Sequence, residues 1–138
     1  MTHTGVRQVE DAKAFLEFEY REVKDLAKHF LTVVIGVLAV TVTFADRILD
    51  VAEASTFQKV LIAMAWGLGL LAFVLGGGAI WAIYDAGVYA RNTTLAPGAT
   101  FPYAHLRNWS YGFLACGGLL FAISLALLVV GGVVRLLK

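Results

Sequence analysis

The chain has 138 residues, of which 59% are hydrophobic and 15% are charged, and its formal net charge is +1. Soluble domains of this length carry a charge on about a quarter of their residues, so the composition favours a membrane protein. The small net charge offers no basic surface for nucleic acid. A single cysteine, Cys116, excludes an intrachain disulfide and a cysteine-based metal cluster.

Residues 6–29 are charged but regularly patterned, and they predict a helix on the cytoplasmic side of the membrane. Glu19 interrupts an apolar seam with the three-and-four spacing of a coiled coil, and no Pro or Gly occurs from Val6 to Ile35. We therefore expect one long helix that starts in water and enters the membrane without a break. The seam residues are Val9, Ala12, Leu16, Val23, Leu26 and Phe30, and the same phase continues through Val33, Val37, Val40 and Phe44.

The alternative for residues 6–29 is an amphipathic helix that lies along the membrane surface. Such helices are usually rich in Lys and Arg, whereas this segment has five basic and six acidic residues. The charge balance argues against the surface position. We also expect no cleavable signal peptide, because this segment lacks a short apolar region followed by a small-residue cleavage site.

Three apolar segments have the composition of transmembrane helices. The run from Val60 to Tyr84 contains no charged residue, and as a helix it would be about 37 Å long, against a hydrocarbon core of about 30 Å. Ahead of it, Ser55 and Gln58 have the spacing of a capping box, which sets the expected start of that helix. The predicted membrane segments are residues 30–49, 57–84 and 109–134, within one membrane domain, 1–138.

The connections between these segments are expected to be short or polar. The longest runs from Asp85 to Asn108, with a turn at Pro97-Gly98 and a favourable helix start at Pro102. The predicted fold is therefore an all-α integral membrane protein with three transmembrane helices, the first extended into the cytoplasm by the charged amphipathic helix.

The distribution of basic residues predicts the orientation. Seven lie in the amino-terminal segment and second connection, and four lie in the first connection and carboxyl end, which favours a cytoplasmic amino terminus and an external carboxyl terminus. We expect a multi-pass protein of the cell membrane, the inner membrane of a bacterium. The seven are Arg7, Lys13, Arg21, Lys24, Lys28, Arg91 and Arg107; the four are Arg47, Lys59, Arg135 and Lys138.

Each membrane segment also carries a stripe of small residues. Helices in lipid associate largely through close van der Waals contact, and small side chains permit that contact. These stripes therefore predict helix-packing and oligomer interfaces. They comprise Thr32, Gly36, Ala39 and Thr43 in the first segment, Ala65, Gly69, Ala72, Gly76 and Ala79 in the second, and Ala115, Gly118 and Ala122, continued by Ala126, in the third.

The number of small faces exceeds what three helices of one chain would use. Residues 76–78 are three consecutive glycines, which present small residues on nearly every side of the second segment. Glycine costs up to about 1 kcal/mol in a helix relative to alanine, so this concentration needs a packing explanation. We expect a homo-oligomer; a flexible kink at the three glycines is the rival explanation.

No pattern of catalytic, metal-binding or cofactor-binding residues is present. Ionisable residues lie at the segment ends, where anchoring explains them, which disfavours proton-coupled and charge-coupled transport. The histidines, His3, His29 and His105, form no helical pair, and no glycine-rich loop has phosphate-binding spacing. The chain resembles small bacterial diacylglycerol kinases in architecture only, because its second and third segments lack carboxylates. We expect no enzyme activity and no cofactor.

Two functions fit this composition. The first is a non-catalytic scaffold or accessory subunit of a membrane complex, which associates with itself or with other membrane subunits through the small-residue faces. The second is an oligomeric pore- or channel-forming membrane effector. Its wall would be formed by Thr32, Thr41, Thr43 and the glycine backbone.

Overall fold

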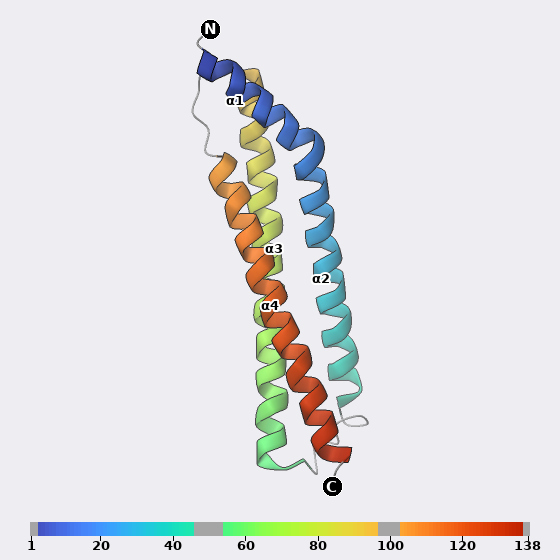
Figure 1. Cartoon of the computed structure of the whole chain (residues 1–138). Helices are drawn as coiled ribbons and strands as arrows, with labels where there is room; N and C mark the ends of the chain where they lie inside the picture. The colour runs from blue at the N-terminus through green and yellow to red at the C-terminus, as the bar shows by residue number, and fades with distance from the viewer. Residues whose placement is uncertain (1–2, 46–53, 97–102, 137–138) are drawn as a thin grey trace. The chain divides into compact units, whose positions relative to one another are not determined.

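The computed structural model describes residues 3–45, 54–96 and 103–136, and every regular element in them is a helix. The order along the chain is α1 (His3–Ala14), η1 (Phe15–Glu19), α2 (Tyr20–Thr43), α3 (Thr56–Leu95) and α4 (Tyr103–Leu136) (Figure 1). The predicted turn at Pro97-Gly98, the residue Pro102, and Asp46 and Arg47 at the end of the first span lie outside the described residues.

The first helical stretch is continuous from α1 through η1 to α2, as the unbroken pattern after Val6 predicts. The segment η1 differs from its neighbours because it is a π-helix, with hydrogen bonds from residue i to residue i+5. Such a turn accommodates an extra residue without ending the helix.

Helix α3 starts at the predicted capping box. The Ser55 amide donates a hydrogen bond to Gln58 Oε1 at 3.0 Å, and the Gln58 amide donates to Ser55 Oγ at 3.4 Å. These reciprocal bonds satisfy two amides that have no partner within the helix, so the predicted cap is confirmed. The helix then continues to Leu95, well beyond the end of the charge-free run at Tyr84.

Three helices are long and apolar enough to cross a membrane: Gly5–Thr43, Thr56–Leu95 and Tyr103–Val134. Together they suggest a multi-pass membrane protein. Helix α3 has 40 residues and would measure about 60 Å, roughly twice the thickness of a hydrocarbon core. Each long helix therefore has room for both a membrane-spanning part and a part in water.

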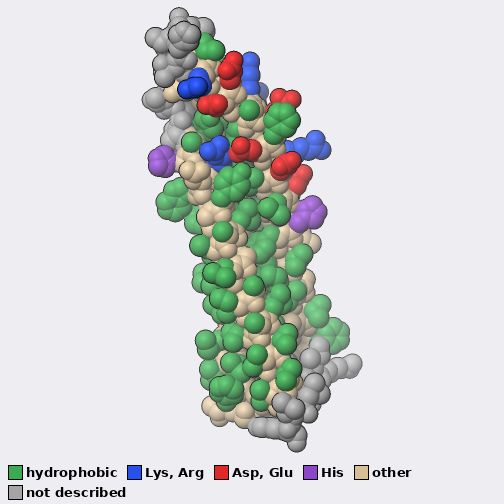
Figure 2. All heavy atoms as spheres, in the orientation of Figure 1, with side chains coloured by type: hydrophobic (Ala, Val, Ile, Leu, Met, Phe, Trp, Pro, Cys, Tyr) green, Lys and Arg blue, Asp and Glu red, His purple; other side chains and the backbone are tan. Residues whose placement is uncertain are grey.

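The described chain forms two compact units. Unit 1 comprises Met1–His29 and Gly76–Leu114, and unit 2 comprises Phe30–Leu75 and Ala115–Lys138. In unit 1, Phe15 from η1 is fully buried against Ile83, Ala86 and Ala90 of α3. The charged side chains on the visible face gather over unit 1, as Figure 2 shows.

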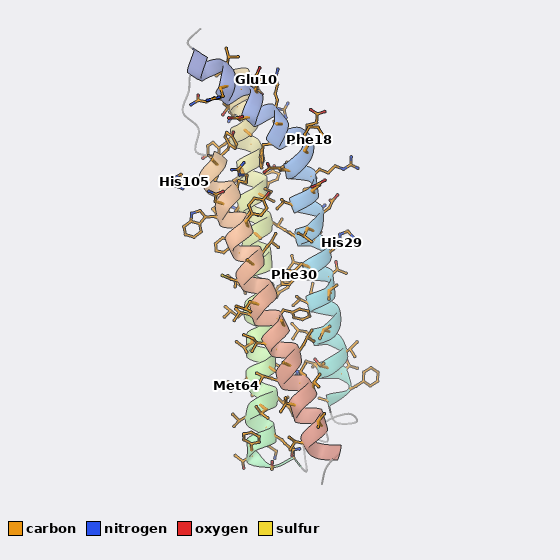
Figure 3. The ribbon with its side chains drawn as sticks, in the orientation of Figure 1. Glu10, Phe18, His29, Phe30, Met64 and His105 are labelled. Atoms are coloured by element: carbon orange, nitrogen blue, oxygen red, sulfur yellow. The ribbon has the colours of Figure 1, made fainter. Side chains whose placement is uncertain are left out.

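Unit 2 is held by a close approach of α2, α3 and α4. Phe30, labelled in Figure 3, meets Phe121 edge-on with ring centroids 6.0 Å apart. A Cβ atom at Gly117 would lie 3.3 Å from the Phe30 ring and 3.4 Å from the Ala72 carbonyl oxygen. Only glycine permits this contact without a shift of its neighbours. Hydrophobic side chains cover the visible face of this unit (Figure 2).

Candidate functional site: helix-packing faces and a polar cluster

The small-residue stripe of α3 is used inside the protomer. All five of its residues, Ala65, Gly69, Ala72, Gly76 and Ala79, are buried. They belong to a longer buried series that alternates steps of four and three residues, from Gln58 through Ile62 to Ala90 and Thr93. This is the spacing of a coiled-coil seam, so α3 turns one continuous face toward its neighbours along nearly its whole length.

Helix α4 meets α3 through a second series, with a spacing of seven residues. Side chains are described for residues 103–134 of α4, and four residues are buried there: Ser110, Gly117, Ser124 and Gly131. This series was not predicted from the sequence, although Ser and Gly alternate there at a regular interval. The seven-residue period is the signal that could have identified it.

The two serines of this series tie α4 to the backbone of α3. In unit 1, Ser110 Oγ donates a hydrogen bond to the Ala79 carbonyl oxygen at 2.9 Å. In unit 2, Ser124 Oγ donates to the Ala65 carbonyl oxygen at 2.7 Å. Both hydroxyls are buried, and comparable bonds between membrane helices contribute about 0.6 kcal/mol on average. These serines therefore link α4 to the backbone of α3.

The other two predicted stripes lie largely on the surface. On α2, Thr32, Gly36, Ala39 and Thr43 are all exposed, and a Cβ atom at Gly36 would meet nothing within 4 Å. On α4, Ala115, Ala122 and Ala126 are exposed, while Gly118 is half-buried. Of the three predicted stripes, the one on α3 is therefore buried inside the protomer, and those on α2 and α4 lie largely on its surface.

The seam predicted for the amino-terminal helix is only partly brought together. Ala12 and Val23 are buried in the core of unit 1, and Leu16 packs against that core. Leu26 is 60% exposed, whereas the next residue, Ala27, is fully buried. The half-buried residues Val9 and Phe30 complete the predicted seam.

The same one-residue offset appears further along α2. Val33 is 54% exposed and Val34 is fully buried, although the predicted phase places Val33 on the seam. Val40 and Phe44 are exposed as well. The helix pitch provides the physical reason: Val23, Val34 and Ala45 are buried at intervals of eleven residues, or three turns of about 3.67 residues, so the buried face drifts away from the predicted 3.5-residue repeat after Val23.

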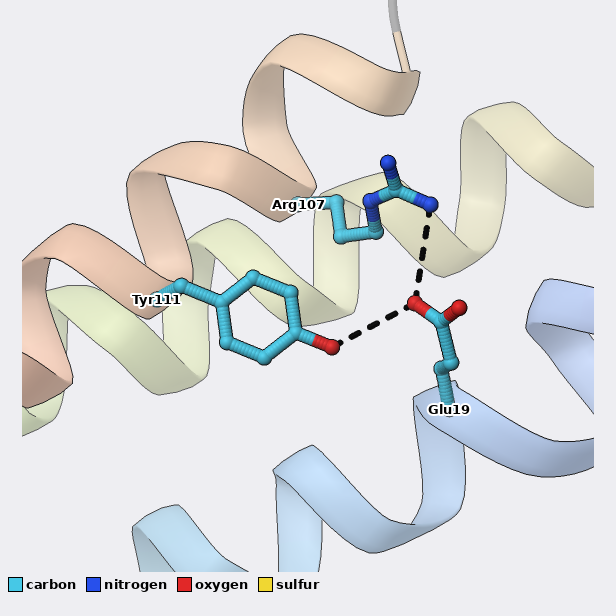
Figure 4. A network of polar contacts seen from close by, with 3 residues as sticks. All are labelled: Glu19, Arg107 and Tyr111. Atoms are coloured by element: carbon cyan, nitrogen blue, oxygen red, sulfur yellow. Dashed lines mark hydrogen bonds and ion pairs between the residues drawn. The ribbon is translucent and has the colours of Figure 1, made fainter.

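Glu19, the polar break in the predicted seam, forms a polar cluster with α4 in unit 1 (Figure 4). Its Oε2 atom accepts a hydrogen bond from the Tyr111 hydroxyl at 3.3 Å and lies 3.5 Å from Arg107 Nη1. The Arg107 and Glu19 side chains are 31% and 46% exposed, so the ion pair contributes at most about 1 kcal/mol. The cluster fixes the π-helical turn against α4.

The chemistry available elsewhere is limited. Among the described residues, no three His, Cys, Asp or Glu side chains gather to hold a metal ion. The Thr41 hydroxyl, proposed above as part of a pore wall, lies within hydrogen-bond distance of the carbonyl oxygens of Val37 at 2.9 Å and Leu38 at 3.1 Å. The hydrogen bonds of this hydroxyl are therefore made within its own helix.

No protein family, curated protein or solved structure matches this chain.

Proposed function

We propose that this protein is a non-catalytic, self-associating scaffold or accessory subunit of a membrane complex. The observation that carries the proposal is the exposed small-residue stripe of α2, formed by Thr32, Gly36, Ala39 and Thr43. Glycine and alanine on a lipid-facing helix give little apolar contact with acyl chains and allow another helix to approach closely. A second helix packed on this stripe would bury Gly36 and Ala39, which are exposed in the protomer.

The position of the stripe supports an interface with a separate chain. Successive helical residues are about 100° apart, so the stripe is centred on the side of α2 opposite Ala27 and Val34. Those two residues are fully buried inside the protomer. The outward face is therefore available to a neighbour while the inward face keeps its intramolecular contacts.

The distribution of charge supports a specific placement in the membrane. The described charged residues of α1 and η1, together with Arg91 and Arg107, would lie at the cytoplasmic side. The predicted membrane segments, 30–49, 57–84 and 109–134, would lie in the lipid of the cell membrane, the inner membrane in a bacterium, with the carboxyl terminus outside. The partners are the bilayer, further copies of the chain and other membrane subunits.

Cysteine cross-linking in native membranes tests the α2 interface. Ala39→Cys, introduced together with Cys116→Ser, should form a covalent dimer under a membrane-permeant oxidant. Val33→Cys in the same background is the matched control, because Val33 is also exposed but lies about 90° around the helix. Equal cross-linking at the two positions, or none at Ala39, would overturn the proposed interface.

A second substitution separates association from folding. Gly36→Leu, added to Ala39→Cys, should abolish the cross-link because the leucine blocks close approach of a second helix. Within the protomer this change meets no atom within 4 Å at Cβ, so the fold should tolerate it. Cross-linking that survives Gly36→Leu would show that the α2 stripes do not pack on each other.

A further inference from the structure

A cavity of about 600 Å³ lies in unit 1 between α3 and α4, on residues that self-association does not use. Its volume is in the range of small-molecule binding sites. Three lining residues belong to α3 and four to α4: Trp81, Asp85 and Tyr89, and His105, Leu106, Trp109 and Phe113.

The lining consists of two regular rows. Trp81, Asp85 and Tyr89 follow one another at intervals of four residues, and so do His105, Trp109 and Phe113. Residues four apart lie on one face of a helix, so each row projects from a single side of its helix. Aromatic residues that only anchor a protein at a membrane interface need no such convergence on a shared cavity.

The register between the two helices orders these residues along the cavity. The hydrogen bond from Ser110 to Ala79 fixes the antiparallel register, which brings Asp85 level with His105 and Trp81 level with Trp109. Phe113 lies further toward the apolar run, because a Cβ atom at Gly78 would be 3.4 Å from its ring. The cavity therefore has a polar end and an aromatic end.

The polar end carries one negative charge. With histidine counted as neutral, Asp85 alone among the seven lining residues has a formal charge. Its carboxylate makes no hydrogen bond or ion pair with another residue of the described chain. The His105 side chain at this end projects outward from α4 in Figure 3. A positively charged ligand would supply the missing partner of the carboxylate.

The aromatic end suits a particular kind of cation. The faces of Trp, Tyr and Phe attract positive charge, and Trp109 and Phe113 already stand edge-to-face with centroids 5.5 Å apart. A quaternary ammonium has no N–H group, so an aromatic wall leaves none of its donors unsatisfied. An apolar substituent on the ligand would extend toward Phe113.

We propose that this cavity binds an organic cation with a quaternary ammonium group and an apolar body. Asp85 balances the charge, Trp81 and Trp109 surround the ammonium group, and Phe113 contacts the apolar part. The shared chemistry covers two sources, a free amphiphilic cation and the choline headgroup of a membrane lipid.

Calorimetric titration of the full-length protein in a maltoside detergent tests the site. The probes are benzyltrimethylammonium and neopentylbenzene, its uncharged carbon isostere. The cation should bind about tenfold more tightly than the isostere, a ratio within the range of a cation–π and carboxylate site. Equal affinities would show an apolar cavity without charge recognition, and absence of binding by both would leave only interfacial anchoring; either result overturns the proposal.

Matched variants assign the effect to the cavity. Asp85→Asn and Trp81→Leu should each weaken benzyltrimethylammonium binding about tenfold. Glu22→Gln removes one negative charge at an exposed residue outside the cavity and should leave the affinity unchanged. If Asp85→Asn and Glu22→Gln have the same effect, the binding reflects net charge and not this site.

Native mass spectrometry then distinguishes the two sources. Protein extracted from nanodiscs containing equal amounts of phosphatidylcholine and phosphatidylglycerol is compared with Asp85→Asn protein prepared in the same way. Preferential retention of phosphatidylcholine, lost in Asp85→Asn, supports a lipid headgroup as the ligand. Calorimetric binding without this preference supports a free cation.

Discussion

In unit 1, Gly87 of α3 lies directly against the Tyr20 ring of α2. Substitution of Gly87 therefore tests the packing of these two helices. A Cβ atom there would overlap the Tyr20 ring, with Tyr20 Cδ2 at 2.9 Å and Cζ at 3.0 Å. The ring cannot easily withdraw, because Tyr20 also contacts Phe15 edge-on at 6.2 Å and Lys24 Nζ lies 5.2 Å from its centroid. Gly87→Ala must therefore displace an aromatic ring or a helix.

The expected change in the free energy of unfolding for Gly87→Ala is the difference between two effects. Overpacking of this kind costs about 1–3 kcal/mol, and the better helix propensity of alanine returns up to about 1 kcal/mol. Gly87→Ala should thus destabilise unit 1 by about 0–2 kcal/mol. Gly77→Ala in the same unit is the matched control. Nothing lies within 4 Å of its added Cβ, so it should stabilise the protein by up to about 1 kcal/mol.

Equilibrium unfolding in mixed micelles, at increasing mole fractions of dodecyl sulfate, measures both variants against the wild type. Tyr20→Leu supplies a further check in a double-mutant cycle, because removal of the ring should reduce the cost of Gly87→Ala. Equal changes in the free energy of unfolding for Gly87→Ala and Gly77→Ala would show that the Tyr20 ring does not restrict the space at Gly87.

Three further outcomes are expected from the hydrogen bonds and the ion pair. Ser124→Ala should lower the free energy of unfolding by about 0.6 kcal/mol, up to about 1.7, measured in the same micelles. A loss above that range would contradict a role limited to one interhelical bond. Ser55→Ala and Gln58→Ala should each cost about 1 kcal/mol and increase amide hydrogen exchange in the first turn of α3, without effect on the rest of that helix. A double-mutant cycle on Glu19→Gln and Arg107→Gln should give a coupling energy of at most about 1 kcal/mol that falls with added salt, and a coupling insensitive to salt would contradict the partly exposed pair.

The lengths of the apolar runs were sufficient to predict three helices long enough to span a membrane. The spacing of two capping side chains was sufficient to predict where the central helix begins. A run such as residues 60–84 contains no group that prefers water, and the Ser55–Gln58 cap depends on side chains three residues apart. The length of α3 was not predicted, because Asp85 ends the charge-free run without ending the helix. A helix can leave lipid and continue in water when its buried face continues, and residues 86, 90 and 93 continue it.

The inward and outward faces were harder to predict from sequence. Small-residue stripes occur on all three segments, and the sequence provides no measure of which stripe meets a neighbour in the same chain. The burial of the α3 stripe and the exposure of the α2 stripe depend on rotation about the helix axes. The π-helical segment at residues 15–19 was not predicted either, because its hydrogen bonding has no simple residue pattern.

Ser110 and Ser124 illustrate a related difficulty. In the sequence each is only a polar residue in or near an apolar run long enough to span a membrane. Their bonds to Ala79 and Ala65 become visible once α3 and α4 are placed side by side. The cavity beside Asp85 also depends on that antiparallel register.

Native mass spectrometry of the wild-type protein released from nanodiscs tests the proposed self-association most directly. We expect an assembly whose mass is an integer multiple, two or greater, of the 14.9 kDa chain, and a shift toward the single chain when Gly36 is replaced by leucine. Val33→Phe, at an exposed position away from the stripe, should keep the number of chains that the wild-type assembly has. A wild-type protein that leaves the nanodisc only as a single chain would contradict the account.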